Sequence, residues 1–143
     1  MTTSFAALGV ADDLVAALAE GGITDPFPIQ ELTIADVLAG LDVCGKAKTG
    51  SGKTLAFGLP LLQMAKRAAS RKPRALVLVP TRELATQVRD ELKPLGAVRQ
   101  VHVAAIYGGA DMDKQIRRLE KGAEVVIATP GRLIDLLERN ELD

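Results

Sequence analysis

The sequence has no tryptophan, and aromatic residues make up only 3% of its 143 residues. Lysine and arginine together number 18, as do aspartate and glutamate, so the formal net charge is zero. A platform of several aromatic side chains that stacks bases is therefore not predicted. Attraction of a polyanion by whole-chain charge is not predicted either, and any such contact must come from a few placed groups.

Cysteine and histidine are also scarce, with Cys44 and His102 as their single representatives. One cysteine cannot form an internal disulfide and fits a reducing compartment, so we predict a cytoplasmic protein. We interpret Cys44 as a small buried strand residue, and His102 as too isolated to anchor a histidine metal site. Residues 1–5 carry no signal-peptide pattern, and polar residues or glycine interrupt every apolar run before it reaches membrane-span length.

The stretch Ala47–Thr54 is the strongest local signal that the sequence does contain. It follows a short apolar run, 41–44, that predicts a strand, and it leads into a helical pattern that begins near Gly52. Strand, glycine-rich turn and helix form the context of a loop that holds phosphate groups on backbone N–H groups. Lys53 would then reach the outer phosphates, and the hydroxyl of Thr54 would bind Mg²⁺. The alternative is a plain glycine-rich turn between strand and helix.

Four apolar runs alternate with helical patterns, which predicts an α/β fold with a mainly parallel sheet in one domain. The predicted strands cover residues 41–44, 75–79, 101–106 and 125–128. The run at 75–79 is continuous, which is typical of a strand buried on both faces. The residues predicted to face inward from the helices are Ile29, Leu32, Ala35, Leu38, Leu55, Leu59, Leu62, Leu84, Val88, Leu92, Leu95, Leu133, Ile134 and Leu137.

Four loops follow these strands directly, namely Ala47–Thr54, Pro80–Ala85, Gly108–Gly109 and Thr129–Arg132. Ligands of open α/β sheets bind at the carboxyl ends of the strands. We therefore expect the four loops to converge on one edge of the sheet.

Five stretches resemble, in order, successive motifs of the DEAD-box RNA helicases: Pro26–Gln30, Ala47–Thr54, Pro80–Ala85, Gly108–Gly109 and Thr129–Arg132. The general phosphate-loop pattern has glycine where Ala47 stands, but the family's own first motif begins with alanine. The resemblance implies a RecA-like P-loop fold, with ATP and Mg²⁺ as cofactors and RNA as partner. It identifies residues 22–30 as the family's Q motif, and residues 1–143 as a partial first RecA-like domain that is incomplete at its C-terminal end.

The resemblance assigns nucleotide roles to several residues. Gln30 is similar to the glutamine that reads the adenine edge, a task for which an amide offers both a donor and an acceptor. Phe5 takes the place of an upstream aromatic, although packing on the first helix is an equal alternative. Ile23 stands where the family has an aromatic, and Lys48 replaces a glutamine and is expected to be solvated. The implied cofactor-binding set is Phe5, Ile23, Pro28, Gln30, Thr49, Gly50, Ser51, Gly52, Lys53 and Thr54.

The resemblance also assigns a set of RNA contacts: Pro80, Thr81, Arg82, Gly108, Gly109, Thr129, Pro130, Gly131 and Arg132. Arginine suits phosphate because its planar fork of N–H groups can donate two hydrogen bonds at once. Contacts to the sugar–phosphate backbone carry no sequence information, so the implied binding is sequence-independent. For Arg82, the alternative is an ordinary surface residue paired with Glu83 or Asp90.

The Asp-Glu-Ala-Asp tetrapeptide that names the family does not occur in this sequence, and it is expected beyond Asp143 together with a second RecA-like domain. Lys53 and Thr54 are then the catalytic groups present. We predict a helicase fragment that binds ATP–Mg and RNA but does not hydrolyse ATP, from a parent that unwinds short duplexes or remodels RNA. An unpaired sheet edge predicts self-association, in the extreme a swapped dimer.

Two other functions stay open. A P-loop kinase or GTPase would explain Lys53 and Thr54, but it would leave Pro26–Gln30 and Thr129–Arg132 without a role. A non-enzymatic module that binds nucleotide or RNA would need no acidic motif. A comparison of ATP with GTP binding separates the first of these from the helicase interpretation.

Overall fold

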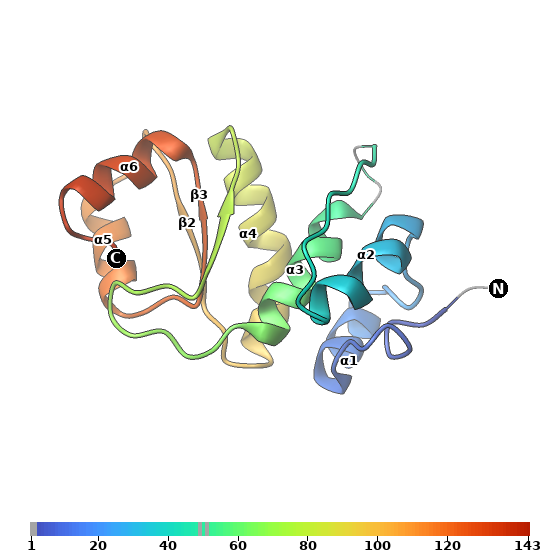
Figure 1. Cartoon of the computed structure of the whole chain (residues 1–143). Helices are drawn as coiled ribbons and strands as arrows, with labels where there is room; N and C mark the ends of the chain where they lie inside the picture. Colours follow the sequence, from blue (N-terminus) through green and yellow to red (C-terminus); the bar gives the residue numbers. More distant parts are fainter. Residues whose placement is uncertain (1–2, 49, 51) are drawn as a thin grey trace. The chain divides into compact units, whose positions relative to one another are not determined.

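The computed structural model describes residues 3–48, 50 and 52–143. The chain divides into two compact units, unit 1 (Met1–Met64) and unit 2 (Ala65–Asp143). The position of one unit relative to the other is not determined (Figure 1). The prediction of a single domain over residues 1–143 therefore stays a prediction.

Unit 1 contains the helices α1 (Asp12–Glu20), α2 (Pro28–Leu38) and α3 (Lys53–Met64). Pro28 opens α2, where a missing N–H leaves no hydrogen bond unmade. The helices α2 and α3 pack against each other. The predicted inward face of α3 is confirmed, because Leu55, Leu59 and Leu62 are all buried. The other large side chains in the core of unit 1 are Phe5, Leu14, Leu18 and Ile34.

The inward face of α2 differs from the prediction. Leu32 is 74% exposed, whereas Gln30, Thr33 and Ile34 are buried. Apolar side chains occur on nearly every side of this helix, so their spacing does not mark a single face. Hydrogen bonds fix the rotation instead, because Gln30 Oε1 accepts from the N–H of Phe27 at 2.8 Å and turns the side chain inward.

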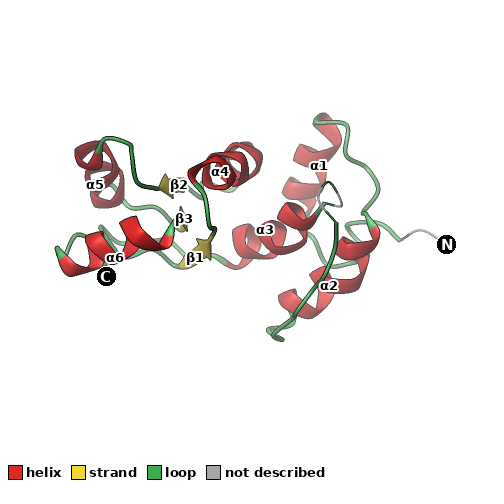
Figure 2. Ribbon diagram, turned by 90° about the horizontal axis from the view of Figure 1, so that it is seen from above, coloured by secondary structure: helices red, strands yellow, loops and turns green. Residues whose placement is uncertain are grey.

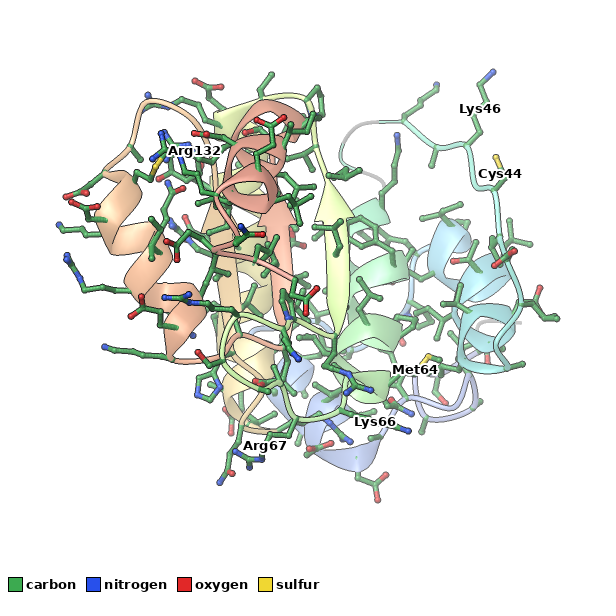
Figure 3. The ribbon with its side chains drawn as sticks, turned by 60° about the vertical axis from the view of Figure 1, so that its left-hand side comes forward. Cys44, Lys46, Met64, Lys66, Arg67 and Arg132 are labelled. Atoms are coloured by element: carbon green, nitrogen blue, oxygen red, sulfur yellow. The ribbon has the colours of Figure 1, made fainter. Side chains whose placement is uncertain are left out.

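The predicted strand at residues 41–44 is absent, and these residues lie in the loop between α2 and α3. Leu41 is 59% and Val43 is 40% exposed. Cys44 is exposed rather than buried, and Figure 3 shows it on the outside of this loop near Lys46. A strand needs a neighbour for its N–H and C=O groups, and none pairs with residues 41–44 among the described residues.

Unit 2 is built on a parallel sheet whose strand order is β1 (Ala75–Leu78), β3 (Val125–Ala128) and β2 (Val103–Ile106). Each of the two outer strands pairs in register with β3, so that Leu76 and Ala104 both lie beside Val126. The predicted α/β fold with a parallel sheet is confirmed here. The strand predicted at 101–106 is two residues shorter at its start.

The burial of the outer strand β1 differs from the prediction. Central β3 is buried at every residue, but along β1 half-buried and exposed side chains alternate. Leu76 is 48% and Leu78 is 56% exposed. In the part of the chain that the structure describes, β1 and β2 each have a strand neighbour on one side only, but β2 is mostly buried whereas β1 is not.

Helices cover both faces of this sheet. Figure 2 looks along the strands and shows α4 (Arg82–Ala97) on one side, with α5 (Met112–Glu120) and α6 (Pro130–Glu138) on the other. The apolar cluster beneath α5 and α6 contains Ala104, Ile106, Leu119, Ala123, Val126, Ala128, Leu133, Leu136 and Leu142.

The predicted inward face of α6 is wrong at two of its three residues, whereas that of α4 is confirmed at Val88, Leu92 and Leu95. In α6, Leu136 is buried, whereas Ile134 is 53% and Leu137 is 44% exposed. In α4, Ala85 is buried in place of Leu84, which is 40% exposed. Both helices carry more apolar residues than one face can bury, and the fit to the sheet selects among them.

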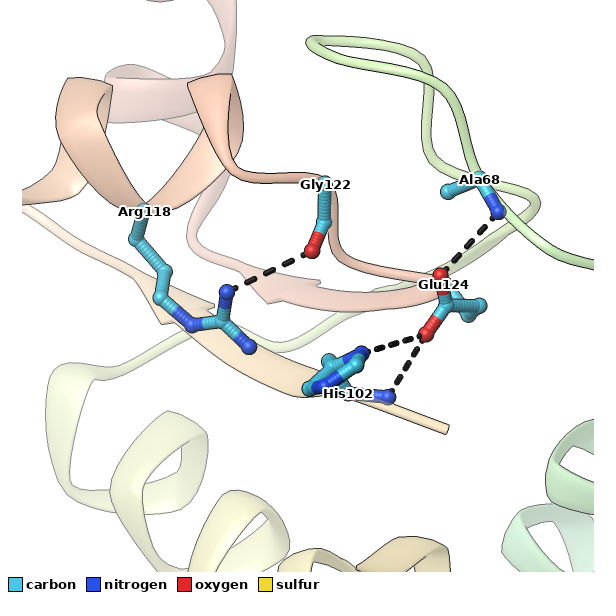
Figure 4. Close-up of polar contacts among 5 residues, drawn as sticks. All are labelled: Ala68, His102, Arg118, Gly122 and Glu124. Carbon is cyan, nitrogen blue, oxygen red and sulfur yellow. Dashed lines mark hydrogen bonds and ion pairs between the residues drawn. The ribbon is translucent and has the colours of Figure 1, made fainter. Parts of the chain in front are cut away.

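The amino ends of the strands are fastened by one buried carboxylate, that of Glu124 (Figure 4). Its Oε1 accepts from the backbone N–H of His102 at 2.7 Å and lies 2.9 Å from the ring Nδ1. Its Oε2 accepts from the N–H of Ala68 at 3.0 Å. Glu124 therefore joins the segment before β1 to the first residues of β2 and β3.

Candidate functional site

The phosphate-loop stretch belongs to unit 1, and its last two residues, Lys53 and Thr54, are the first two of α3. Gly50 and Gly52 have φ values of 82° and 85°, in the left-handed region that favours glycine. Thr49 and Ser51, two predicted cofactor contacts, lie outside the described residues. The glycines thus stand where the backbone needs them, directly before a helix N-terminus that favours an anion.

Lys53 and Thr54 form the first turn of α3, as predicted from the loop pattern. The Lys53 side chain is exposed, and it has no hydrogen-bond or ion-pair partner among residues 3–48, 50 and 52–143. Its stem helps to line an apolar pocket of about 260 Å³ together with Gly45, Ala56 and Phe57. A free ammonium at the start of a helix is suited to bind a phosphate group.

Gln30 connects the predicted Q motif to the phosphate loop. It is only 2% exposed, and its Nε2 donates to the carbonyl oxygen of Gly52 at 3.0 Å. Its Oε1 accepts from the N–H of Phe27. Both ends of the amide are therefore engaged within the chain, and reading an adenine edge requires Gln30 to exchange these partners.

Gly52 also lies close to the Q motif. A Cβ at this position would come too near Gln30 Nε2 and would lie 2.7 Å from Cδ2 of Phe27. Real Cβ atoms essentially never approach a heavy atom that closely. The glycine is therefore required by packing as well as by its backbone angle.

The remaining predicted base contacts differ in exposure. Ile23 is 38% exposed and Pro28 is exposed, so both offer apolar surface. Phe5 is only 1% exposed, which favours its interpretation as a packing residue. Phe27 is 50% exposed and, with Pro28, lines a hollow of about 340 Å³ beside Ala47. Sequence reasoning did not single out Phe27, although an aromatic between two prolines was a usable signal.

Mg²⁺ has only one predicted protein ligand here, the hydroxyl of Thr54. Among the described residues, no group of three or more His, Cys, Asp or Glu side chains could hold a metal ion. This donor set fits Mg²⁺ that arrives with a nucleotide, because such an ion is held largely by phosphate oxygens and water.

The three predicted RNA loops belong to unit 2 and follow β1, β2 and β3. The backbone ladder continues into them, since Val79 N–H donates to Ala128 and Thr129 N–H donates to Ile106. The predicted convergence is confirmed for these three loops. The fourth loop, Ala47–Thr54, lies in unit 1, and its approach to the others stays a prediction.

Arg82 contacts the loop after β2. Its guanidinium carbon lies 5.9 Å above the centre of the Tyr107 ring, a cation–π arrangement. Gly109 has a φ of 83°, and a Cβ there would lie 3.1 Å from Arg82 Nη1. Arg82 is exposed, and among the described residues it has no ion pair with Glu83 or Asp90.

Arg132, in the first turn of α6, contacts the same loop from the other side; Figure 3 shows it beside that loop. Its Nη1 donates to Gln115 Oε1 at 3.0 Å and makes a longer contact of 3.5 Å with the carbonyl oxygen of Ala110. Gln115 Nε2 donates in turn to the carbonyl oxygen of Tyr107 at 3.0 Å. Sequence reasoning missed Gln115, but its place on the inward face of α5, three and four residues from Met112 and Leu119, was a signal.

The other predicted RNA contacts lie around these two arginines. Thr81 caps α4, because its hydroxyl accepts from the N–H of Leu84 at 3.2 Å. Gly108 and Gly131 have open space where a Cβ would be. The exposed or half-exposed members of the set are Pro80, Thr81, Gly108, Gly109, Thr129, Pro130 and Gly131.

Residues 27–143 match the protein family described as DEAD/DEAH box helicase. The chain is 46% identical over 138 residues to the DEAD-box ATP-dependent RNA helicase CshA of Streptococcus pneumoniae serotype 4, an alignment that covers 96% of this chain and 26% of that protein. It is also 46% identical over 143 residues to DEAD-box ATP-dependent RNA helicase 9 of Oryza sativa subsp. japonica, with 96% of this chain and 22% of that protein covered.

A solved structure is similar as well, that of a hypothetical ATP-dependent RNA helicase from Sulfolobus tokodaii. The TM-score is 0.83 at 37% identity, over 92% of this chain and 38% of that chain. The likeness confirms the predicted RecA-like fold. The chain spans about a quarter of the length of the curated relatives named above. None of the helices among the described residues has the length and apolar character that a membrane crossing needs.

Proposed function

The chain belongs to the DEAD/DEAH box helicase family, and we propose that it binds ATP–Mg through unit 1 and the RNA backbone through unit 2. The observation that carries the proposal is the placement of exposed cationic side chains at the family's motif positions. Lys53 offers a free ammonium at a helix N-terminus. Arg82 and Arg132 both contact the loop that follows β2, at Tyr107 and Ala110. The activity proposed for the parent protein is ATP-dependent unwinding or remodelling of RNA.

In unit 1, the nucleotide's phosphates would bind the backbone N–H groups around Gly50 and Gly52, with Lys53 on the outer phosphates. Bound Mg²⁺ would supply charge neutralisation between phosphate oxygens, and the hydroxyl of Thr54 would hold it. Gln30 would read the adenine edge after releasing the carbonyl of Gly52. The exchange would give up the hydrogen bonds to Gly52 and Phe27, and the acceptor and donor of the adenine edge would replace them on the amide.

In unit 2, the sugar–phosphate backbone would lie along the loops after β1, β2 and β3. Arg82 and Arg132 would donate to phosphate oxygens, with Thr81 and Thr129 beside them. These contacts carry no base information, so binding should be sequence-independent. The cytoplasmic setting remains a prediction from the single cysteine.

We propose further that this chain by itself does not hydrolyse ATP. No Asp-Glu-Ala-Asp tetrapeptide occurs in its sequence. Phosphoryl transfer depends on acids that place Mg²⁺ and the attacking water and on positive charge around the transition state. The alternative of a nucleotide- or RNA-binding module describes the chain itself and is compatible with a helicase parent.

Equilibrium binding of fluorescent ATP and GTP analogues tests this function together with RNA binding. The proposal expects ATP to bind more tightly than GTP, and two single-stranded RNAs of unrelated sequence to bind equally at one salt concentration. Preference for GTP would favour the kinase or GTPase alternative. RNA-stimulated release of phosphate that is lost in Lys53→Ala would contradict the proposed lack of hydrolysis.

A further inference from the structure

One buried glutamine, Gln115, connects the loops that carry the two arginines of unit 2. It is 7% exposed on α5, and both ends of its amide are engaged. Nε2 donates to Tyr107 O and Oε1 accepts from Arg132 Nη1, each at 3.0 Å. The orientation of the amide is fixed, because turning it over would place a donor against a donor and an acceptor against an acceptor.

The contacts extend beyond Gln115 to Arg82. The ring of Tyr107, whose carbonyl accepts from Gln115, also carries the guanidinium of Arg82 at 5.9 Å. A continuous series of contacts therefore runs from Arg82 through Tyr107 and Gln115 to Arg132. It links the loops that follow all three strands, although Gln115 itself belongs to none of them.

We propose that Gln115 is a positioning residue that holds Arg132 and the Tyr107 loop ready for the RNA backbone. The inference rests on the proposed RNA-binding function of unit 2. Gln115 and the carbonyl oxygen of Ala110 both contact Nη1 of Arg132, which leaves the N–H groups on Nη2 and Nε for a phosphate. A guanidinium that is already held loses less side-chain entropy when it binds.

The neutrality of Gln115 matters as much as its position. A carboxylate at this place would pair with Arg132 and compete with phosphate for the same positive charge. The amide supplies an acceptor without such competition. It can also donate to Tyr107 O, which an ionised carboxylate cannot do.

A double-mutant cycle of Gln115→Leu and Arg132→Ala tests the proposal on the 143-residue chain. The probe is a short labelled single-stranded RNA, and its binding is followed by fluorescence anisotropy. Gln115→Leu should weaken binding about three- to tenfold, the range expected for one hydrogen bond. In the Arg132→Ala background the same change should cost little, because the group that it positions is gone. Losses that simply multiply would overturn the proposal, since they indicate a general effect on the fold.

Two further variants keep the test decisive. Gln63→Leu is the matched control, because the amide of Gln63 also forms hydrogen bonds at both ends, to Gly9 and Ala11 in unit 1. This variant should leave the RNA affinity unchanged.

Gln115→Glu preserves the side-chain size, so it serves if the leucine variant folds poorly. It should reduce the slope of log affinity against log salt by about 0.7, the value of one phosphate contact on a single strand. An unchanged slope would overturn the proposal.

The reactivity of Arg132 toward phenylglyoxal gives a readout that needs no RNA. Gln115→Leu should increase its modification rate several-fold relative to Arg82, because one held nitrogen is released. Failure of the wild-type chain to bind RNA would overturn the proposed function of unit 2 and this inference with it. Wild-type binding that survives Gln115→Leu unchanged would overturn the inference alone.

Discussion

The amide of Gln30 connects α2 to the phosphate loop in unit 1. It fixes the rotation of α2, and it binds the carbonyl of Gly52 in the phosphate loop. Its importance could be predicted from the family pattern, but its inward direction could not. A glutamine in a helix is usually a surface residue, and only the hydrogen bonds to Phe27 and Gly52 explain its burial.

Lys53→Ala should weaken ATP binding by about tenfold or more. A hydrogen bond between charged groups contributes about 1.5–3 kcal/mol, and this lysine has no partner within the described chain that would compete for it. Isothermal titration with ATP–Mg measures the change. Lys48→Ala is the matched control, since Lys48 is exposed in the loop that leads to Gly50 and is expected to be solvated. Equal losses in both variants would argue against a specific phosphate role.

Gly52→Ala should destabilise the chain more than Gly40→Ala. Both glycines have positive φ values, so both variants incur a backbone strain of about 1–2 kcal/mol. Only at Gly52 would the new Cβ collide with Gln30 and Phe27, and overpacking adds about 1–3 kcal/mol. Urea denaturation followed by far-UV circular dichroism measures both. Similar free energies of unfolding would show that the neighbours of Gly52 move aside freely.

Helices and strands differ in how well their sequences specify them. The strand Val125–Ala128 is a local feature, and it matches the prediction at both ends. The predicted strand at residues 41–44 failed because pairing depends on a neighbour that local sequence does not reveal. The buried faces of α2 and α6 failed because each helix has surplus apolar residues, among them Leu32 and Ile134.

Glu124→Gln should lower the free energy of unfolding by about 1–3 kcal/mol at neutral pH, because an amide cannot accept at both ends as the carboxylate does. Burial alone raises the pKa of Glu124, but hydrogen bonds from His102 and Ala68 outweigh it and hold the pKa below its ordinary range. The carboxylate's contribution is therefore complete above pH ~4.3, the usual glutamate pKa, and is lost as the pH falls from there through the lower pKa of the folded state.

Urea denaturation between neutral pH and pH 3 checks this prediction. The difference between wild type and Glu124→Gln should shrink with falling pH. Glu120→Gln is the control, since Glu120 is an exposed partner of Arg71 and its loss should change stability by less than about 1 kcal/mol. A difference that stays constant across the pH range would show that ionisation of Glu124 is not the cause.

Several large apolar side chains of unit 2 are exposed to solvent. Leu76 and Leu78 on β1 and Ile134 and Leu137 on α6 are each 44–56% exposed. Together with the one-sided pairing of β1, this surface is consistent with the prediction that copies of the chain associate. The sequence predicted an unpaired sheet edge, and of the two edge strands β1 and β2 only β1 carries exposed leucines.

Sedimentation velocity at increasing concentration should show a monomer that converts to dimers or larger species. Leu78→Lys should shift the equilibrium toward monomer at least several-fold, because a charge on an edge strand opposes pairing with another chain. Val98→Lys is the control, since Val98 is similarly exposed, at 48%, but follows α4 rather than β1. A wild-type chain that stays monomeric at every concentration would contradict self-association.

The strand order β1-β3-β2 has a consequence for folding during synthesis on the ribosome. The central strand, Val125–Ala128, is the last of the three to leave the ribosome. Residues 75–78 and 103–106 are synthesised first, and in the described sheet neither pairs with the other. Until the third strand arrives, the nascent chain carries two apolar segments without a partner, a state that favours aggregation and attracts chaperones. Neither of the described strand pairings can therefore form before the segment that is made last.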